Sequence, residues 1–226
     1  MKNVIITGTS RGIGLELLKI FSNNNFNVLS LTRNFETVTA LNLKNVHSFH
    51  MDISKEKSIH KAVEKITKRF KKIDVIINNA GCLINKPFLE TTFKDFEKVY
   101  SVNVFGVATL INQLFKFFDS DANIVNVSSI GGIPGSSKFP GLSAYSSSKA
   151  ALNLLSEMLA EEFKDIGVKF NNLALGAVQT EMLQEAFPGY KAQISAEKMA
   201  SYIYKFSTED YKFFNGKTIP ISISNP

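Results

Sequence analysis

The sequence contains a single cysteine, Cys82, among its 226 residues. An internal disulfide is therefore excluded, which is typical of a reducing compartment, and we predict a cytoplasmic location. A reactive thiol would need basic neighbours, and the sequence around Cys82 lacks them. We interpret Cys82 instead as a small hydrophobic residue.

Long apolar runs are also missing from the sequence. No stretch approaches the roughly 18 residues of a membrane-spanning helix, and the apolar run at 4–6 is too short for a signal peptide. The formal net charge is +6, but the lysines and arginines are scattered and form no dense run. We therefore predict that this charge solvates helix faces, and that neither nucleic acid nor a membrane is a partner.

Apolar residues make up 44% of the chain, enough for a sizeable core, and the length suits one domain spanning 1–226. Apolar runs predict strands at 4–7, 27–31, 46–50, 73–78, 124–127, 168–175 and 218–223. Helical spacing predicts helices at 13–24, 55–71 (with Ser54 as N-cap), 93–118, 144–164 and 196–206. This alternation predicts a doubly wound α/β fold of about seven parallel strands with helices on both faces. Its ligand would lie beyond the carboxyl ends of the strands.

Three glycines follow the first predicted strand, with the spacing G-x-x-x-G-x-G. Glycines permit a tight turn and a close approach of the backbone to a pyrophosphate, and the next helix offers free N–H groups at its start. We therefore predict a dinucleotide cradle in this turn. Its residues are Gly8, Ser10, Arg11, Gly12, Ile13 and Gly14.

The same turn also matches G-x-S-x-G, the nucleophile elbow of α/β-hydrolases, with Ser10 as nucleophile. We reject this alternative because the elbow needs preceding strands, and because Gly14 would have no role. The only histidines, His47, His50 and His60, also lie in the N-terminal half. Those histidines lack metal-ligand spacing, so no metal site is predicted.

The end of the second strand bears on the choice of dinucleotide. NAD-binding folds place an acidic residue there to hold the ribose 2′-OH, whereas this chain has Arg33 followed by Asn34. A guanidinium suits the 2′-phosphate of NADP, so NADP is predicted in preference to NAD. Arg11 could stack on the adenine or share that phosphate. The alternative is that both arginines are solvated surface groups, and Glu36 nearby counts against NADP.

Tyr145 and Lys149 are four residues apart in a predicted helix, so their side chains share one face. A phenol titrates near ~10 in water, and a nearby ammonium lowers that pKa, so the pair could exchange a proton with a carbonyl/alcohol couple. Polar residues also end the neighbouring strands, among them Ser129 after the fifth and Asn79 after the fourth. All of these groups would meet at the predicted ligand crevice.

Over about residues 4–180 these motifs resemble the short-chain dehydrogenase/reductase family in its single-domain form. The matching residues are Thr7, Gly8, Gly12, Ile13, Gly14, Asp52, Ile53, Asn78, Asn79, Ala80, Gly81, Asn103, Ser129, Tyr145 and Lys149. The resemblance implies an NADPH-dependent oxidoreductase that reduces a ketone or aldehyde to an alcohol. The alternative is a non-catalytic NADP-binding regulatory or signalling protein of the same fold.

The resemblance also implies a role for each catalytic residue. Tyr145 would protonate the carbonyl oxygen while hydride arrives from the nicotinamide, and Ser129, rather than Ser128, would polarise that oxygen. Lys149 would bind the nicotinamide ribose and lower the pKa of Tyr145. Asn103 would hold a water that links Lys149 to solvent.

Further cofactor contacts are implied in the same way. Asp52 and Ile53 would contact the adenine, and Asn79, with Ala80 and Gly81, would line the site. Val178 and Thr180 would fix the carboxamide. Those two contacts follow a departure from the family pattern, since Leu175-Gly176 stands where a Pro-Gly pair is usual.

A short substrate lid is expected at 177–195. Its apolar residues could contact an apolar or aromatic substrate, or they could pack inside the protein, and the sequence favours neither alternative. These residues are Met182, Leu183, Phe187 and Tyr190. The family's usual glycine pair near the C-terminus is missing, which weakens the case for tetramer contacts, while the apolar long helices favour a dimer. We therefore predict a homo-oligomer, either dimer or tetramer, acting on a small-molecule carbonyl/alcohol substrate.

Overall fold

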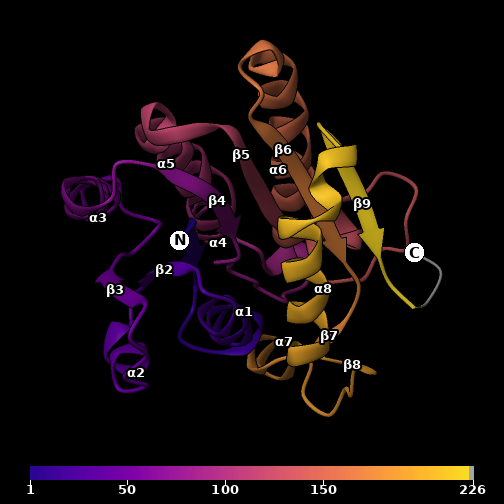
Figure 1. The fold of residues 1–226 in the computed structure, drawn as a ribbon. Coiled ribbons are helices and arrows are strands. Elements are labelled where there is room, and N and C mark those ends of the chain that lie inside the picture. The colour runs from indigo at the N-terminus through magenta and orange to yellow at the C-terminus, as the bar shows by residue number, and fades with distance from the viewer. Residues whose placement is uncertain (224–226) are drawn as a thin grey trace.

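The computed structural model describes residues 1–223 and contains a seven-stranded parallel sheet with the strand order β3-β2-β1-β4-β5-β6-β9 (Figure 1). The predicted α/β fold is therefore confirmed. The strands are β1 Asn3–Thr7, β2 Asn27–Thr32, β3 Val46–His50, β4 Ile73–Asn78, β5 Phe118–Ser129, β6 Lys169–Leu175 and β9 Lys217–Ile221. The order reverses on either side of β1, so the switch point lies between the carboxyl ends of β1 and β4.

Helices cover both faces of the sheet, as Figure 1 shows. They are α1 Gly12–Asn23, α2 Phe35–Thr39, α3 Glu56–Arg69, α4 Phe93–Tyr100, α5 Gly106–Leu114, α6 Ser143–Glu162, α7 Glu181–Ala186 and α8 Ala196–Thr208. A separate two-stranded ribbon pairs β7 Val178–Gln179 with β8 Ile194–Ser195. Within residues 1–223, every helix is too short or too polar to cross a lipid bilayer.

Two apolar clusters separate the faces. On one face Ile59, Leu110 and Leu152 bring α3, α5 and α6 onto the sheet, and all three side chains are buried. On the other face, α1 and α8 pack together through Phe21 and Tyr204, whose ring centroids are 4.8 Å apart in an edge-on arrangement. The central strands β1 and β4 are mostly apolar because both of their faces are covered.

The predicted single helix over 93–118 is wrong. It is divided into α4 and α5 by a π-helical turn, Ser101–Phe105, and the chain is already extended at Phe118, where β5 begins. The chain is closely packed just after the π-helical turn. A Cβ on Gly106 would lie 2.1 Å from the Ile53 carbonyl oxygen. The wider turn keeps both helix segments against the core while it places Asn103 inside the molecule, fully buried.

The predicted N-cap of α3 is also wrong. Lys55 occupies that position, and its side chain makes no capping hydrogen bond within the described residues. The Ser54 hydroxyl donates instead to Asp52 Oδ1 at 2.7 Å. A short polar side chain can bond a neighbouring side chain as readily as a helix end. The sequence also gave no indication of α2, α7 or the small β7–β8 ribbon.

A row of amide side chains crosses the buried sheet. Asn78, Asn126, Asn172 and Thr218 are direct neighbours in register on β4, β5, β6 and β9. Asn78 Nδ2 donates to Asn126 Oδ1 at 2.7 Å, and Asn172 Nδ2 donates to Thr218 Oγ1 at 3.0 Å. Asn126 Nδ2 also donates to Ser156 Oγ of α6 at 2.7 Å. The row therefore fixes α6 against the centre of the sheet.

Replacing Asn126 with Ala should lower the free energy of unfolding by about 2–4 kcal/mol, because Asn78 Nδ2 loses its buried acceptor and Ser156 Oγ loses one of its hydrogen bonds. Urea unfolding followed by circular dichroism measures this. Asn112→Ala, at an exposed position on α5, is the matched control and should change stability by less than about 0.5 kcal/mol. Equal stability of the two variants would show that the row does not anchor α6.

Candidate active site

The turn between β1 and α1 has the backbone that a phosphate cradle requires. Gly8 and Gly12 adopt positive φ angles of 71° and 55°. A Cβ on Gly14 would lie 2.1 Å from the Gly8 carbonyl oxygen, so no larger residue fits there. Among the described residues, no acidic side chain lies in the first turn of α1, and the N-cap residue Arg11 makes no side-chain cap. These features suit a dinucleotide pyrophosphate.

Asn79 supports this turn from the neighbouring strand. Its Nδ2 donates to the carbonyl oxygens of Thr7 at 3.0 Å and Gly8 at 3.1 Å. In return, Thr7 Oγ1 accepts hydrogen bonds from the backbone N–H groups of Asn79 and Ala80. The ends of β1 and β4 are therefore fastened together. Asn79 was expected to line the cofactor site, and its observed contacts hold the shape of the turn.

The ends of β2 and β3 form the side of the crevice expected to receive the adenosine. Arg33 and Asn34 are exposed after β2, and Arg33 makes no hydrogen bond or ion pair with any of residues 1–223. At Asp52, burial would raise the carboxyl pKa, but hydrogen bonds from Ser54 and the charges of Lys55 and Arg33 outweigh it and lower that pKa. Ile53 is only 6% exposed and belongs to the core, so its side chain has little surface left for an adenine.

Ser129 and Tyr145 meet where β5 ends and α6 begins. The Ser129 hydroxyl lies close enough to the phenol to act on its pKa, and Ser129 Oγ accepts the Gly131 backbone N–H at 3.2 Å. Ser128 lies on the other side of the strand, where its buried hydroxyl pairs with Asn153 Oδ1 at 2.6 Å. The geometry thus puts Ser129, and not Ser128, beside the phenol.

Lys149 is buried on the same helix, with 3% of its surface exposed. Its Nζ donates to the Val127 carbonyl oxygen at 2.8 Å and lies 5.7 Å from the centroid of the Tyr145 ring. Burial lowers the pKa of Lys149 to about 8. Burial also raises the pKa of Tyr145 to about 12, which the hydrogen bond with Ser129 only partly opposes. The expectation that Lys149 lowers the Tyr145 pKa is wrong for this structure, because desolvation of the phenol dominates.

Asn103 reaches the same place from the π-helical turn. Its Nδ2 donates to the Cys82 carbonyl oxygen and to Ser148 Oγ, both at 2.9 Å, and its Oδ1 accepts the Cys82 N–H at 2.8 Å. Both amide hydrogens of Asn103 are therefore used within the protein. Asn103 was expected to hold a water beside Lys149. The groups of Asn103 that remain available for this water are the second lone pair of Oδ1 and the backbone.

Gly81 marks the point where these elements converge. A Cβ placed on it would lie 3.7 Å from Asn103 Oδ1, 3.8 Å from Met182 Cε and 3.9 Å from Lys149 Nζ. The end of β4, the π-helical turn, α6 and α7 thus border one space. Of the apolar lid residues expected to face a substrate, Met182 lies at this space.

The segment after β6 covers the glycine turn. Thr180 caps α7, its Oγ1 accepting the Leu183 N–H at 3.2 Å, and its methyl group lies 3.5 Å from a Cβ position on Gly12. Val178 is buried in β7 and pairs with Ile194. Arg11 was expected at the cofactor, but its guanidinium forms a bidentate ion pair with Glu185 of α7.

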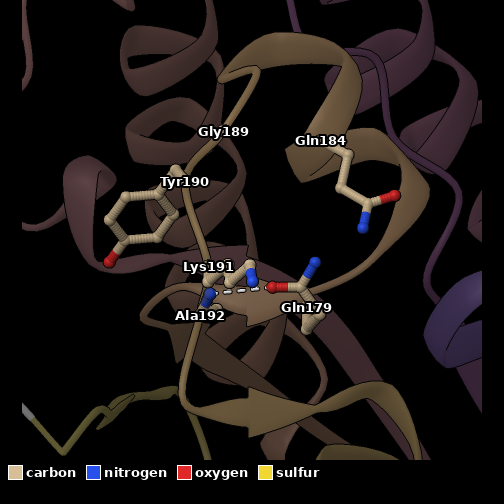
Figure 2. A pocket seen from close by; sticks show the side chains of 6 residues that line it. All are labelled: Gln179, Gln184, Gly189, Tyr190, Lys191 and Ala192. Atoms are coloured by element: carbon tan, nitrogen blue, oxygen red, sulfur yellow. Dashed lines mark hydrogen bonds between the residues drawn. The ribbon is translucent and has the colours of Figure 1, made fainter.

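The lid segment also borders an open hollow of ≈ 470 Å³, whose lining residues do not include Ser129, Tyr145 or Lys149. Figure 2 shows the amides of Gln179 and Gln184 pointing toward one another across it, while the ring of Tyr190 points away. The side-chain Oε1 of Gln179 accepts a hydrogen bond from the Ala192 backbone N–H at 2.8 Å. Tyr190 borders the hollow, but its side chain is 54% exposed and its ring is turned away from the two amides.

The sequence motifs did not identify three side chains that lie at the site. Ser148 links Asn103 to the carbonyl oxygen of Tyr145, to which its hydroxyl donates at 2.7 Å. Asn85 Nδ2 donates to the Ala186 carbonyl oxygen at 2.8 Å and so ties the lid to the loop after β4. Glu185 holds Arg11. Helical spacing could have revealed Ser148, which lies three residues after Tyr145 on α6. Asn85 and Glu185 could not be found in this way, because their partners lie more than 100 positions away in the sequence.

The buried ammonium predicts a specific pH dependence of stability. The folded-state pKa of Lys149, about 8, lies below the ordinary value of 10.5, so the unfolded chain holds this proton more tightly. Between pH 7 and pH 10 the free energy of unfolding of the wild type should therefore rise by roughly 2 kcal/mol relative to Lys149→Met. Urea titrations of both proteins at the two pH values measure the difference. A pH-independent difference would mean that Lys149 titrates as it does in water.

Comparison with known proteins places this geometry in a family. The model of the short chain dehydrogenase family matches residues 2–191. The 3-oxoacyl-(acyl-carrier-protein) reductase FabG of Aquifex aeolicus is 30% identical over 237 residues, 96% of this chain and 94% of that protein. Against four other curated relatives, the match spans only 35% to 65% of the relative's length.

Solved structures agree with this result. ElxO with NADP bound is 31% identical, with a TM-score of 0.84 over 97% of this chain and 96% of that one. A 3-ketoacyl-(acyl-carrier-protein) reductase from Brucella melitensis, complexed with NADH, has the same fold at 23% identity, with a TM-score of 0.86 over 97% and 96% of the two chains. The resemblance found in the sequence is thus confirmed: the chain belongs to the short-chain dehydrogenase/reductase family.

Proposed function

We propose that this protein is an NADPH-dependent oxidoreductase that reduces a ketone or aldehyde to an alcohol. The observation that carries this proposal is the convergence of Tyr145 and Ser129 beside the buried Lys149, at the strand ends that border the glycine turn. A reduction of this kind needs a proton donor and a polarising hydrogen bond at the carbonyl oxygen. It also needs a cradle for a dinucleotide, which Gly8, Gly12 and Gly14 supply.

The titration of Tyr145 favours the direction of reduction. With a pKa of about 12 the phenol is protonated at neutral pH, so it can donate to an oxygen that becomes negative. Ser129, which lies beside the phenol, would donate its hydroxyl proton to the same oxygen. NADPH, when bound, supplies the hydride. The chain's own contribution is to place two hydroxyl groups at the reacting oxygen.

Lys149 and Asn103 complete the proposed machinery. With a pKa of about 8, Lys149 is mostly protonated at neutral pH and can donate to the ribose hydroxyls of the nicotinamide. Asn103 and Ser148 brace the first turn of α6, because Ser148 bonds both Asn103 and the Tyr145 carbonyl oxygen. Through this bracing, Asn103 positions the backbone that carries Tyr145.

The choice of NADP over NAD rests on the end of β2. Arg33 is exposed and makes no ion pair within residues 1–223, so its five N–H donors are available to a 2′-phosphate. ElxO, 31% identical, has NADP bound in its structure. The carboxylate of Glu36, also exposed, lies on α2 and could oppose a phosphate there. We infer that Arg33 outweighs it.

We further propose that residues 1–226 form one domain and that residues 177–195 act as a lid over a small-molecule substrate. The contact between Met182 and the Gly81 region and the hydrogen bond from Asn85 to Ala186 support a lid at this place. The non-catalytic alternative is not favoured, since a binding protein has no need of a phenol, a hydroxyl and a buried ammonium together.

Self-association is proposed through α4, α5 and α6. Four large apolar side chains on and between these helices are 58–81% exposed, and a groove of ≈ 930 Å³ runs between α5 and α6. The four are Phe93, Phe105, Leu154 and Met158. Apolar surface gathered on one set of helices is typical of a subunit interface, and a dimer or tetramer would cover it.

Tyr145→Phe should reduce kcat/KM by at least about 10²-fold, because it removes the proton donor while it keeps the ring. NADPH oxidation at 340 nm against a panel of diketones, quinones, aldehydes and ketosteroids measures this. The matched control is Tyr202→Phe on α8, which should retain wild-type turnover. Equal turnover by Tyr145→Phe and the wild type would refute the proposed chemistry.

Arg33→Ala should weaken NADPH binding by about tenfold and NADH binding by less than about twofold, because only NADPH carries the 2′-phosphate. Isothermal titration calorimetry with each cofactor measures both dissociation constants. Arg69→Ala, an exposed arginine on α3, should bind both cofactors as the wild type does. If the ratio of the two constants stays the same in Arg33→Ala, Arg33 has no part in cofactor choice.

A further inference from the structure

Arg11 has a partner that its place in the glycine turn does not suggest. Its two terminal nitrogens contact the two carboxylate oxygens of Glu185, the second pair at 2.9 Å. Glu185 lies on α7, 174 residues away in sequence, so the pair joins the nucleotide turn to the lid. A bidentate pair of this geometry occupies the same N–H donors that a phosphate would contact.

A second carboxylate of α7 lies beside the turn itself. Glu181 Oε2 is 3.3 Å from a Cβ position on Gly12, and Glu181 forms no ion pair with the residues that the structure describes. Glu185 and Glu181 both act electrostatically on Arg11, Glu185 more strongly through its hydrogen bond, and together they raise the pKa of Arg11. The lid thus presents two negative groups to a turn built for an anion.

We propose that Glu185 is a specificity-determining residue that competes with the 2′-phosphate of NADP for Arg11. When the phosphate takes the guanidinium, Glu185 loses its partner, and α7 loses one of its ties to the nucleotide turn. This inference rests on the proposed NADPH dependence and deepens it. It assigns Arg11 to the phosphate, rather than to stacking on the adenine.

The exposure of the pair makes such an exchange feasible. The side chains of Arg11 and Glu185 are 47% and 61% exposed, and an exposed ion pair typically changes an equilibrium by about fivefold or less. A phosphate monoester carries up to two negative charges and three acceptor oxygens, so it is the stronger partner for a guanidinium. The carboxylate therefore reduces NADPH affinity without abolishing it.

Glu185→Gln tests the proposal in the full-length protein, because it keeps the size of the side chain and removes its charge. The NADPH dissociation constant should fall by about three- to fivefold, while the NADH constant changes by less than about twofold. Calorimetric titration with each cofactor measures both constants and needs no substrate. The NADPH gain should shrink at high salt, as for any exposed charge pair.

Glu181→Gln is the matched control, because it removes the same charge from the same helix. Glu181 acts on Arg11 without a hydrogen bond and faces the turn that holds the pyrophosphate, which NADPH and NADH share, so this variant should change the ratio of the two affinities less than Glu185→Gln does. In an Arg11→Ala background, Glu185→Gln should not favour NADPH over NADH, because the guanidinium for which Glu185 and the phosphate compete is gone. A selective gain that persists without Arg11 would overturn the proposal.

The outcomes separate this inference from the proposed function. If Arg11→Ala weakens NADPH selectively while Glu185→Gln binds both cofactors like the wild type, Glu185 does not compete and only the inference fails. If Glu185→Gln tightens NADPH and NADH equally, Arg11 serves the adenine or the pyrophosphate, and the inference again fails. If neither Arg11→Ala nor Arg33→Ala discriminates between the cofactors, the proposed NADPH dependence fails with it.

Discussion

The packing of α6 against β5 is the contact on which the rest of the site depends. A Cβ on Gly132 would lie 2.8 Å from the Ala150 backbone nitrogen, so helix and strand end approach as closely as glycine allows. Polar bonds fix the same contact along its length, from Lys149 on Val127 to Asn126 on Ser156. Because both partners of each bond are buried, sliding or rotating α6 would leave them unsatisfied. Tyr145 lies beside Ser129 because these contacts hold α6 in one position against β5.

This arrangement requires a buried charge that does not favour folding. An ammonium that is 3% exposed, with a backbone carbonyl as its hydrogen-bond acceptor, is desolvated without a carboxylate to neutralise it, and its lowered pKa records that penalty. The amide row across β4, β5, β6 and β9 has a similar character, since Asn78 Oδ1 has no partner among the described residues. Apolar side chains would stabilise these positions more. A buried ammonium at Lys149 is what the proposed proton-transfer site needs, so stability would be given up there for the proposed chemistry.

Much of the fold could be predicted from the sequence because buried parallel strands leave an unmistakable pattern. The runs at β1 and β4 are mostly apolar on both faces, and the glycines after β1 fix the first turn. The π-helical turn escaped prediction because one extra residue barely disturbs a 3.6-residue period, so α4 and α5 read as one helix. Ser54 failed as a cap because its hydroxyl had a nearer partner in Asp52.

The site itself was predictable only where a short segment determines it. The four-residue spacing of Tyr145 and Lys149 places both side chains on one face of α6, whatever surrounds the helix. The pKa of each was not predictable, because desolvation depends on elements far away in sequence, and it reversed the expected shift of Tyr145. The two arginines show the same limit. Arg33 stands without an ion pair in the described chain, as its place after β2 suggests, whereas Arg11 is engaged by a helix that no local motif connects to it. The two guanidinium groups therefore differ in how strongly the rest of the chain holds them. Because carboxylates of the lid act on Arg11, a motif that describes only the glycine turn leaves out part of the electrostatics at that turn.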